Sequence, residues 1–208
     1  MSGILLTGFE PFGGETTNPS WQAVVLAATL WTRPDAFSIA ELPTEFARSS
    51  GVLDAAIAAS QPDVVLCVGQ AGGIRSLQLE RVAINLDDAR IADNAGDQPI
   101  DTPAFPDAPA AHFTSVPVKR GLAALTAAGL PATLSLSAGT FVCNHTFFHL
   151  LDSHPRGGFV HIPYAPGQLG AVTAPTMPVE TVAEALVILA EIYLDHESDL
   201  EVPGGALF

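Results

Sequence analysis

The sequence predicts an α/β fold, a three-layer α/β/α sandwich in which a twisted, mostly parallel sheet lies between two layers of helices. Segments with strand patterns alternate along the chain with segments of helical periodicity. Segment 62–69 is apolar on both faces, which is typical of a parallel strand covered by helices on each side. Hydrophobic residues make up 48% of the 208 residues and charged residues only 14%, so the chain can bury a large core.

In the first half of the chain, each expected element has a local signal. Asn18-Pro19 is typical of a helix start, because an N-cap side chain followed by proline fits the first helical turn. Segment 77–86 alternates like a strand with one buried face. The expected strands of this half are 3–9, 37–42, 62–69 and 77–86, and the expected helices are 19–30 and 45–59.

The second half opens with a polar loop over residues 87–113, which is rich in Asp, Pro and Gly. The helix that follows is ended by Gly129 and Pro131. Further helices are expected at 117–128, 143–151 and 178–197, and strands at 132–136 and 158–163, with a Gly/Pro/Thr loop at 166–177. No repeat or linker interrupts this order, so we expect a single domain over residues 1–208.

The charge balance excludes some partners. The formal net charge is −14, from 22 acidic and 8 basic residues. Such a chain is repelled by nucleic acid and by anionic membranes, so neither is expected as a partner. The two cysteines, Cys67 and Cys143, do not make a disulfide framework, and no apolar run is long enough to span a bilayer. We therefore expect a cytoplasmic protein.

Cys143 follows the turn-like Ser-Ala-Gly-Thr of residues 137–140 and opens an apolar segment of helical length. At a helix start, unpaired backbone N–H groups and the helix dipole favour a thiolate. Cysteine is also often a small buried hydrophobe, so nucleophile and core residue both stay open for Cys143. Cys67 lies inside an apolar strand and is expected to be a core residue.

His161 lies near the carboxyl end of a predicted strand, where functional groups of α/β sheets gather. A histidine in such a position, taken by itself, is more often a hydrogen-bonded structural residue. His145 and His149 have the i, i+4 spacing of zinc-binding helices, but no glutamate base or third ligand accompanies them. No metal site is therefore expected there.

Glu80 is in phase with the apolar positions Val82, Ile84 and Leu86 of the predicted strand. A carboxylate in that phase is expected to be buried, which is costly unless it is paired. Its partner could be an arginine such as Arg90, or a catalytic imidazole that it orients.

Two further segments are open to more than one interpretation. Phe9 and Phe12 flank a glycine-flexed loop, and they could be core residues at a turn or the wall of a pocket. A phosphate-binding loop is excluded, because Gly14-Glu15 stands where lysine and serine are needed. The acidic cluster Asp87, Asp88, Asp93, Asn94 and Asp97 does not fit calcium-loop spacing and is interpreted as a solvated, hydrogen-bonded loop.

Four blocks, taken together, closely resemble the pyroglutamyl peptidase type I (pyrrolidone-carboxylate peptidase) family of cysteine peptidases. They occur in the family's order. The blocks are Thr-Gly-Phe-Glu-Pro-Phe-Gly-Gly (7–14), Val-Gly-Gln-Ala-Gly-Gly (68–73) with Glu-Arg-Val-Ala-Ile-Asn-Leu-Asp-Asp-Ala-Arg-Ile-Ala-Asp-Asn (80–94), Ala-Gly-Thr-Phe-Val-Cys-Asn-His (138–145), and Gly-Gly-Phe-Val-His-Ile-Pro-Tyr (157–164).

The resemblance implies removal of N-terminal pyroglutamate from peptides through a thiol acyl-enzyme. It implies that Cys143 is the nucleophile, that His161 is the general base and acid, and that Glu80 orients the imidazole. It also implies a homotetramer without metal or cofactor. The lactam pocket that it implies is lined by Phe9, Phe12, Phe141 and Val142, with Gln70 nearby.

Two departures from the family pattern stand out. Gln78 occupies a position where most members have Ser or Thr, and segment 152–156 is shorter than in several relatives.

Two other functions remain as alternatives. One is a cysteine amidohydrolase that acts on a different small amide, and the other is a non-catalytic lactam-binding protein on the same scaffold.

Overall fold

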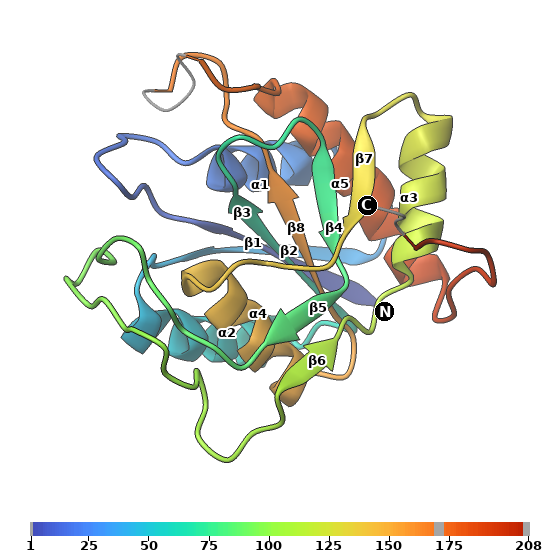
Figure 1. The fold of residues 1–208 in the computed structure, drawn as a ribbon. Coiled ribbons are helices and arrows are strands. Elements are labelled where there is room, and N and C mark those ends of the chain that lie inside the picture. The colour runs from blue at the N-terminus through green and yellow to red at the C-terminus, as the bar shows by residue number, and fades with distance from the viewer. Residues whose placement is uncertain (1, 169–172, 206–208) are drawn as a thin grey trace.

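A computed structural model describes residues 2–168 and 173–205, and a central sheet organises it (Figure 1). The strands of this sheet are β1 (Gly3–Phe9), β2 (Ala36–Leu42), β3 (Val64–Gln70), β4 (Leu77–Glu80), β7 (Ala132–Ser135) and β8 (Gly157–Ile162). The helices are α1 (Pro19–Leu30), α2 (Phe46–Ser60), α3 (Val118–Ala127), α4 (Val142–Ser153) and α5 (Val179–Asp195).

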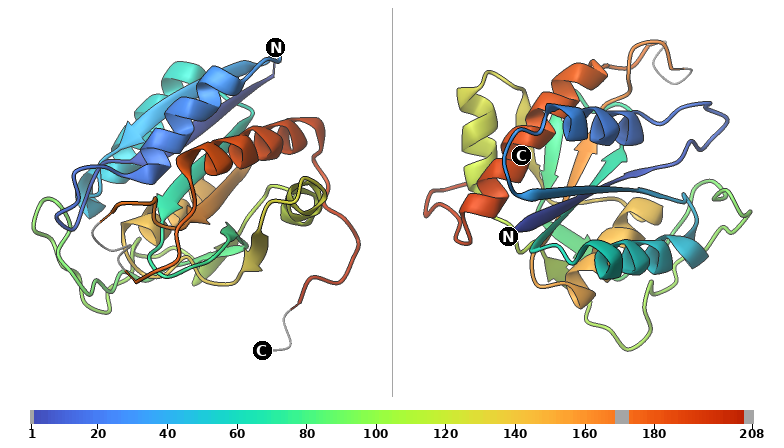
Figure 2. Two further views of the ribbon diagram at one scale, coloured as in Figure 1. Left: turned by 90° about the horizontal axis from the view of Figure 1, so that it is seen from above. Right: turned by 180° about the vertical axis from the view of Figure 1, so that it is seen from behind.

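The strands lie in the order β2-β1-β3-β8-β4-β7. All neighbouring pairs are parallel except β4 and β8, which run antiparallel. Helices α1, α3 and α5 cover one face of the sheet, while α2 and α4 cover the other (Figures 1 and 2). This arrangement confirms the predicted α/β/α sandwich with a mostly parallel sheet.

Side chains along β3 alternate between two hydrophobic cores. Val64, Leu66 and Val68 belong to the core under α1, α3 and α5. Val65 and Cys67 belong to the core under α2 and α4. Because the strand is buried on both faces, its sequence is continuously apolar, as predicted from segment 62–69.

The start of α1 is held by the Asn18 side chain, as the sequence indicated, and by Ser20. Asn18 accepts a hydrogen bond of 3.0 Å from the Ser20 N–H, as an N-cap does. The Ser20 hydroxyl in turn accepts from the Phe9 N–H at 3.0 Å, which ties the helix start to the end of β1. Most predicted elements begin and end within two residues of the observed ones.

The single strand predicted for 77–86 is wrong, because the chain leaves the main sheet at Arg81. β4 ends at Glu80, and β5 (Val82–Ile84) pairs instead with β6 (Ala111–Phe113) in a separate two-stranded sheet. β6 also lies within the segment predicted to be a loop. Both arise from long-range pairing that local periodicity does not report.

Within residues 2–168 and 173–205, no helix combines the length and the apolar character required to cross a bilayer.

Candidate active site

Three side chains named from the sequence meet on the α4 face of the sheet. His161 is the penultimate residue of β8 and points to the same face as Phe159, which packs under α2 and α4. Cys143 is the second residue of α4, at the helix N-terminus, as predicted. Glu80 is the last residue of β4, the strand beside β8.

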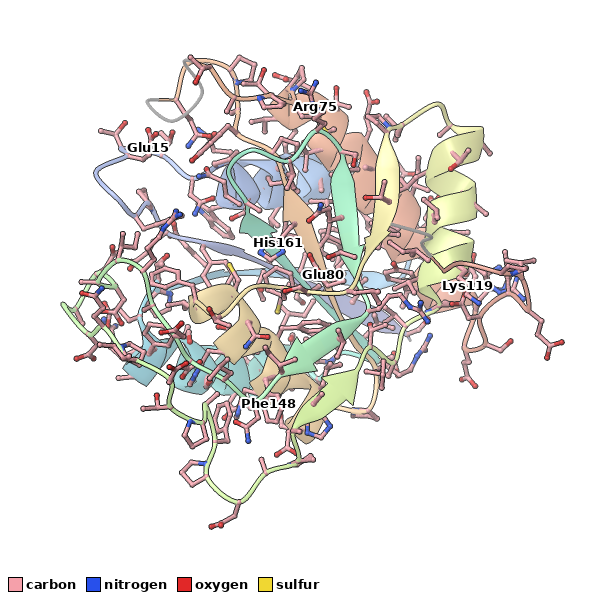
Figure 3. The ribbon with its side chains drawn as sticks, viewed as in Figure 1. Glu15, Arg75, Glu80, Lys119, Phe148 and His161 are labelled. Atoms are coloured by element: carbon pink, nitrogen blue, oxygen red, sulfur yellow. The ribbon has the colours of Figure 1, made fainter. Side chains whose placement is uncertain are left out.

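The antiparallel register of β4 against β8 brings Glu80 to His161. Gln78 lies directly opposite His161 in this register, and Glu80 follows two residues later on the same face. Glu80 Oε1 lies 2.8 Å from His161 Nδ1 (Figure 3). The carboxylate therefore holds one ring nitrogen, and the other nitrogen is left to face Cys143.

Glu80 is fully buried, which confirms the prediction of an in-phase carboxylate in the core. The strand phase that suggested this was only partly right, because Val82 and Ile84 belong to another sheet. Arg90 is exposed, and among the described residues Glu80 pairs with His161, so the arginine alternative does not apply. Glu80 Oε2 has no hydrogen-bond partner among the described residues, so its charge acts mainly on the imidazole.

Gly69 makes room for the thiol of Cys143. A Cβ atom at Gly69 would lie 2.8 Å from Cys143 Sγ and 2.8 Å from Phe159 Cζ, closer than real Cβ contacts. Gly69 is the parallel-register partner of His161, so the thiol lies against the strands at the level of the imidazole. In this position Cys143 is close enough to His161 to influence the pKa of the imidazole.

The surroundings of His161 favour its protonated form. Burial alone would lower the pKa of His161, but hydrogen bonds to Cys143 and Glu80, together with their negative charges, raise it to about 9. An imidazolium that persists at neutral pH stabilises a neighbouring thiolate. By contrast, burial raises the pKa of Cys67 to about 12, as expected for a core thiol.

A cavity of about 710 Å³ opens beside Cys143 and His161. Phe9, Phe12, Phe141 and Gln70 line it, so the structure brings together four of the five residues that the resemblance implied for the lactam pocket. The Val142 side chain is not among the lining residues, because it is buried in the core under α2 and α4. Val142 is the first residue of α4, so its backbone N–H is among those that the helix itself does not use.

Several other residues that line the cavity were missed by sequence reasoning, because they come from loops after different strands. Gln78, one of the two departures, also lines the cavity. For Asn18 the sequence signal indicated only a helix cap. The lining residues not predicted as such include Asn18, Thr44, Asp88, Arg90, Ile91 and Tyr164.

The acidic loop after β5 is not simply solvated, which corrects the interpretation made from its sequence. Asp87 and Asp93 are buried, and Asp93 Oδ2 accepts a hydrogen bond of 2.8 Å from the Phe46 N–H at the start of α2. Asp88 exchanges hydrogen bonds with Thr140, just before α4. These contacts hold the loop as one wall of the cavity.

The histidines of α4 are bound to carboxylates. His145 Nδ1 lies 2.8 Å from Asp87 Oδ2, and His149 Nε2 lies 2.8 Å from Asp54 Oδ1. Both side chains are thus held in contacts within the protein. In the described part of the chain, no three His, Cys, Asp or Glu side chains are grouped so that they could hold a metal ion.

Asn144 joins the cysteine helix to β5, a role that sequence reasoning missed. Its side chain is fully buried, accepts from the Ile84 N–H at 3.0 Å and donates to the carbonyls of Ile84 and Leu86. Its position directly after Cys143 was the only available signal.

Comparison with known proteins gives a consistent picture. The family model described as pyroglutamyl peptidase matches residues 2–196. The pyrrolidone-carboxylate peptidase of Streptomyces coelicolor is 51% identical over 214 residues, which cover 99% of each chain. That of Bacillus subtilis is 47% identical over 210 residues and 98% of each chain.

Solved structures agree with these relatives. The pyroglutamyl peptidase I of Bacillus amyloliquefaciens superposes with a TM-score of 0.93 at 46% identity, over 98% of this chain and 100% of that one. The pyrrolidone carboxyl peptidase of Thermococcus litoralis superposes with a TM-score of 0.87 at 33% identity, over 98% of this chain and 100% of that one.

Proposed function

This chain belongs to the pyroglutamyl peptidase family, and we propose that Cys143, His161 and Glu80 carry out its reaction. The activity is that of a cysteine peptidase that removes N-terminal pyroglutamate from peptides and proteins. The observation that supports the assignment of roles is the Cys143–His161–Glu80 arrangement at the edge of a cavity lined by phenylalanines.

In the first half of the reaction, the Cys143 thiolate attacks the pyroglutamyl carbonyl carbon and forms a C–S bond. The oxyanion lies at the start of α4, where backbone N–H groups are not used within the helix. Each such donor stabilises the transition state by about 3 kcal/mol. As the C–N bond breaks, His161 gives its proton to the leaving amine.

In the second half, the neutral imidazole takes a proton from water, which attacks the thioester carbonyl. The C–S bond breaks, pyroglutamate leaves, and the thiolate–imidazolium pair is restored. Glu80 holds Nδ1 throughout, so that the other ring nitrogen stays directed at the reacting atoms.

The substrate group explains the kind of pocket. Pyroglutamate has no free amine, so an acidic clamp for an ammonium group would serve no purpose. A flat, neutral lactam suits an aromatic slot with a few fixed polar groups. Phe9, Phe12 and Phe141, which line the cavity, would form that slot, with Gln70 as a polar group and Val142 contributing backbone.

The nucleophile is tested with Cys143→Ser. We expect the variant to fold normally and to lose hydrolysis of a pyroglutamyl-amide reporter by more than about 1,000-fold, because a serine hydroxyl is not ionised there. Reporter hydrolysis and circular dichroism provide the two measurements. A wild-type rate in the variant would rule out Cys143 as the nucleophile.

A panel of pyroglutamyl, prolyl and glutaminyl reporters tests the substrate. We expect cleavage of the pyroglutamyl reporter alone. Faster cleavage of another amide would favour a different cysteine amidohydrolase. Failure of iodoacetamide to react with Cys143, together with lactam binding, would favour a non-catalytic binding protein.

We further propose a homotetramer in the cytoplasm. Exposed apolar side chains such as Phe113, Ile100 and Leu136 would support subunit contacts, at 72%, 71% and 62% exposure. Both cysteines are free thiols, which fits a reducing compartment. Light scattering should give the mass of four chains, and a monomer mass would contradict the proposal.

A further inference from the structure

Four neighbouring strands, β1, β3, β8 and β4 in that order, carry residues of the site in a row (Figure 1). Gly69 of β3 is the register partner of His161 in β8, and Gln78 of β4 lies directly opposite His161. Residues that lie directly opposite each other point to the same face of a sheet, so Gln78 shares the face of His161. At the other end of the row, Phe9 of β1 packs against Phe159 of that face, with ring centres 6.4 Å apart.

This order of strands gives a bound substrate a direction. The Cys143 thiol lies against Gly69, so the acyl carbon that it attacks is held over β3. The aromatic slot proposed for the lactam includes Phe9, on the β1 side of the thiol. The leaving nitrogen must come within about 2.6–3.2 Å of His161 to take its proton. The leaving residue therefore extends the opposite way, over β8 and towards β4.

The Gln78 side chain is available to that residue. It is half-buried and lines the cavity, whose volume of about 710 Å³ exceeds what one five-membered ring requires. Cβ atoms of directly opposite residues lie about 4.5–5.5 Å apart, so the Gln78 amide can reach a group bound beside the His161 imidazole. Within residues 2–168 and 173–205, this amide forms no hydrogen bond. Its NH₂ group is thus a donor without a partner in the protein.

We propose that Gln78 is a specificity-determining residue for the leaving group, and that its NH₂ group donates to the main-chain carbonyl of the amino acid that follows pyroglutamate. This inference rests on the proposed function. Only Cα separates that carbonyl from the leaving nitrogen, so the carbonyl lies close to His161 in every peptide substrate, whatever the side chain. Gln78 thereby favours peptides over amides that lack this carbonyl.

Two substrates and two proteins isolate the contact. Pyroglutamyl-alaninamide has the carbonyl, whereas pyroglutamyl-isopropylamide has a methyl group in place of the carboxamide. Gln78→Met nearly keeps the length and volume of the side chain but cannot donate. Both substrates form the same thioester with Cys143, so a change confined to one of them arises before the leaving amine departs, and kcat/KM reports it.

We expect Gln78→Met to lower kcat/KM for the alaninamide about three- to tenfold, the range of one hydrogen bond, and to change it less than about twofold for the isopropylamide. A merely structural role gives another pattern. Because His161 serves both substrates, a disturbed imidazole would lower both kcat/KM values by the same factor. That equal loss would overturn the inference, as would a wild-type kcat/KM for the alaninamide in the variant.

Thr133→Val is the matched control. Thr133 is the register partner of Gln78 in β7, one strand further from His161, and it does not line the cavity. We expect both kcat/KM values to stay as in the wild type. A selective loss for the alaninamide in this variant as well would assign the effect to the sheet and not to the Gln78 amide.

Gln78→Ala covers the case in which Gln78→Met does not fold, and the same selective loss is expected. Protection of Cys143 from iodoacetamide by 2-pyrrolidone should be unchanged, because this ligand occupies only the lactam side. Weaker protection would place Gln78 in the lactam pocket and refute its assignment to the leaving group. Failure of the wild-type protein to cleave the alaninamide would contradict the proposed function, whereas an equal loss for both substrates contradicts the role of Gln78 alone.

Discussion

His161 shows at the residue scale how neighbours decide the chemistry of one side chain. Burial disfavours its charge, yet Cys143 and Glu80 together raise its pKa to about 9. An ordinary histidine loses its proton near pH 6.5. The imidazolium needed to protonate the leaving amine is therefore present across the neutral range.

The pH profile of Glu80→Gln tests this electrostatic balance. In the wild type, His161 stays protonated below its raised pKa, and kcat/KM should fall as pH rises through about 9. Removing the Glu80 charge removes a contribution that raises the pKa of His161, so the alkaline limb should move to lower pH. Reporter assays from neutral to alkaline pH measure it; an unchanged or more alkaline limb would contradict the role of Glu80.

His161→Ala serves as the comparison for the size of the loss. We expect folded Glu80→Gln to lose less kcat than His161→Ala, because an orienting group usually matters less than the group that transfers the proton. An equal or larger loss in Glu80→Gln would reverse this order.

At the element scale, the close approach of α4 to β3 depends on a missing side chain at Gly69. Gly69→Ala would place a Cβ atom 2.8 Å from Cys143 Sγ, so the thiol must move. A displacement of about 1 Å can cost about 100-fold in rate, and we expect a loss of that order in kcat.

Gly51→Ala in α2 is the matched control, because no atom lies within 4 Å of the added methyl group. It should keep full activity and gain about 0.5–1 kcal/mol in unfolding free energy from helix propensity. Wild-type kcat in Gly69→Ala would show that the thiol position tolerates the methyl group.

Asn144 connects α4 to β5 and the cavity wall that follows. Asn144→Ala removes three hydrogen bonds and takes away the acceptor of the half-buried Ile84 N–H, whereas the Ile84 carbonyl keeps its bond from the Leu86 N–H. We expect a loss of about 2–4 kcal/mol in the free energy of unfolding, together with a higher KM. Urea denaturation measures the first quantity. A loss below about 0.5 kcal/mol would mean that other contacts hold β5.

The elements also explain why the short 152–156 segment does not affect the site. It precedes Gly157 at the amino end of β8, whereas His161 is near the carboxyl end. At about 3.3 Å per residue, the strand separates the two by more than 10 Å. This departure from the family pattern therefore lies away from the reacting atoms.

At the scale of the whole molecule, both helical layers share one sheet, and α1 packs beside α5 (Figure 2). We therefore propose that the chain is a single domain and expect one cooperative unfolding transition. Tryptophan fluorescence reports the layer of Trp21 and Trp31, and thiol labelling reports Cys67 in the other layer. Midpoints in urea that differ between the two probes would indicate two units.

Local patterns in the sequence were sufficient for most of the elements. The Asn18 cap, the apolar β3 and the cysteine at a helix start all depend on neighbours within a few residues, so they can be read from spacing. The burial of Glu80 was also indicated. The family resemblance joined Cys143, His161 and Glu80 before their distances were known.

The tertiary structure decided what depends on residues far apart in the chain. Only the antiparallel register of β4 brings Glu80 to 2.8 Å from His161, and only folding places Gly69 against the thiol. The buried Asp87 and Asp93 were misjudged for the same reason. A sequence pattern reports hydrophobic period and turn chemistry, whereas strand register and the partners of buried polar groups are set by packing across the whole core.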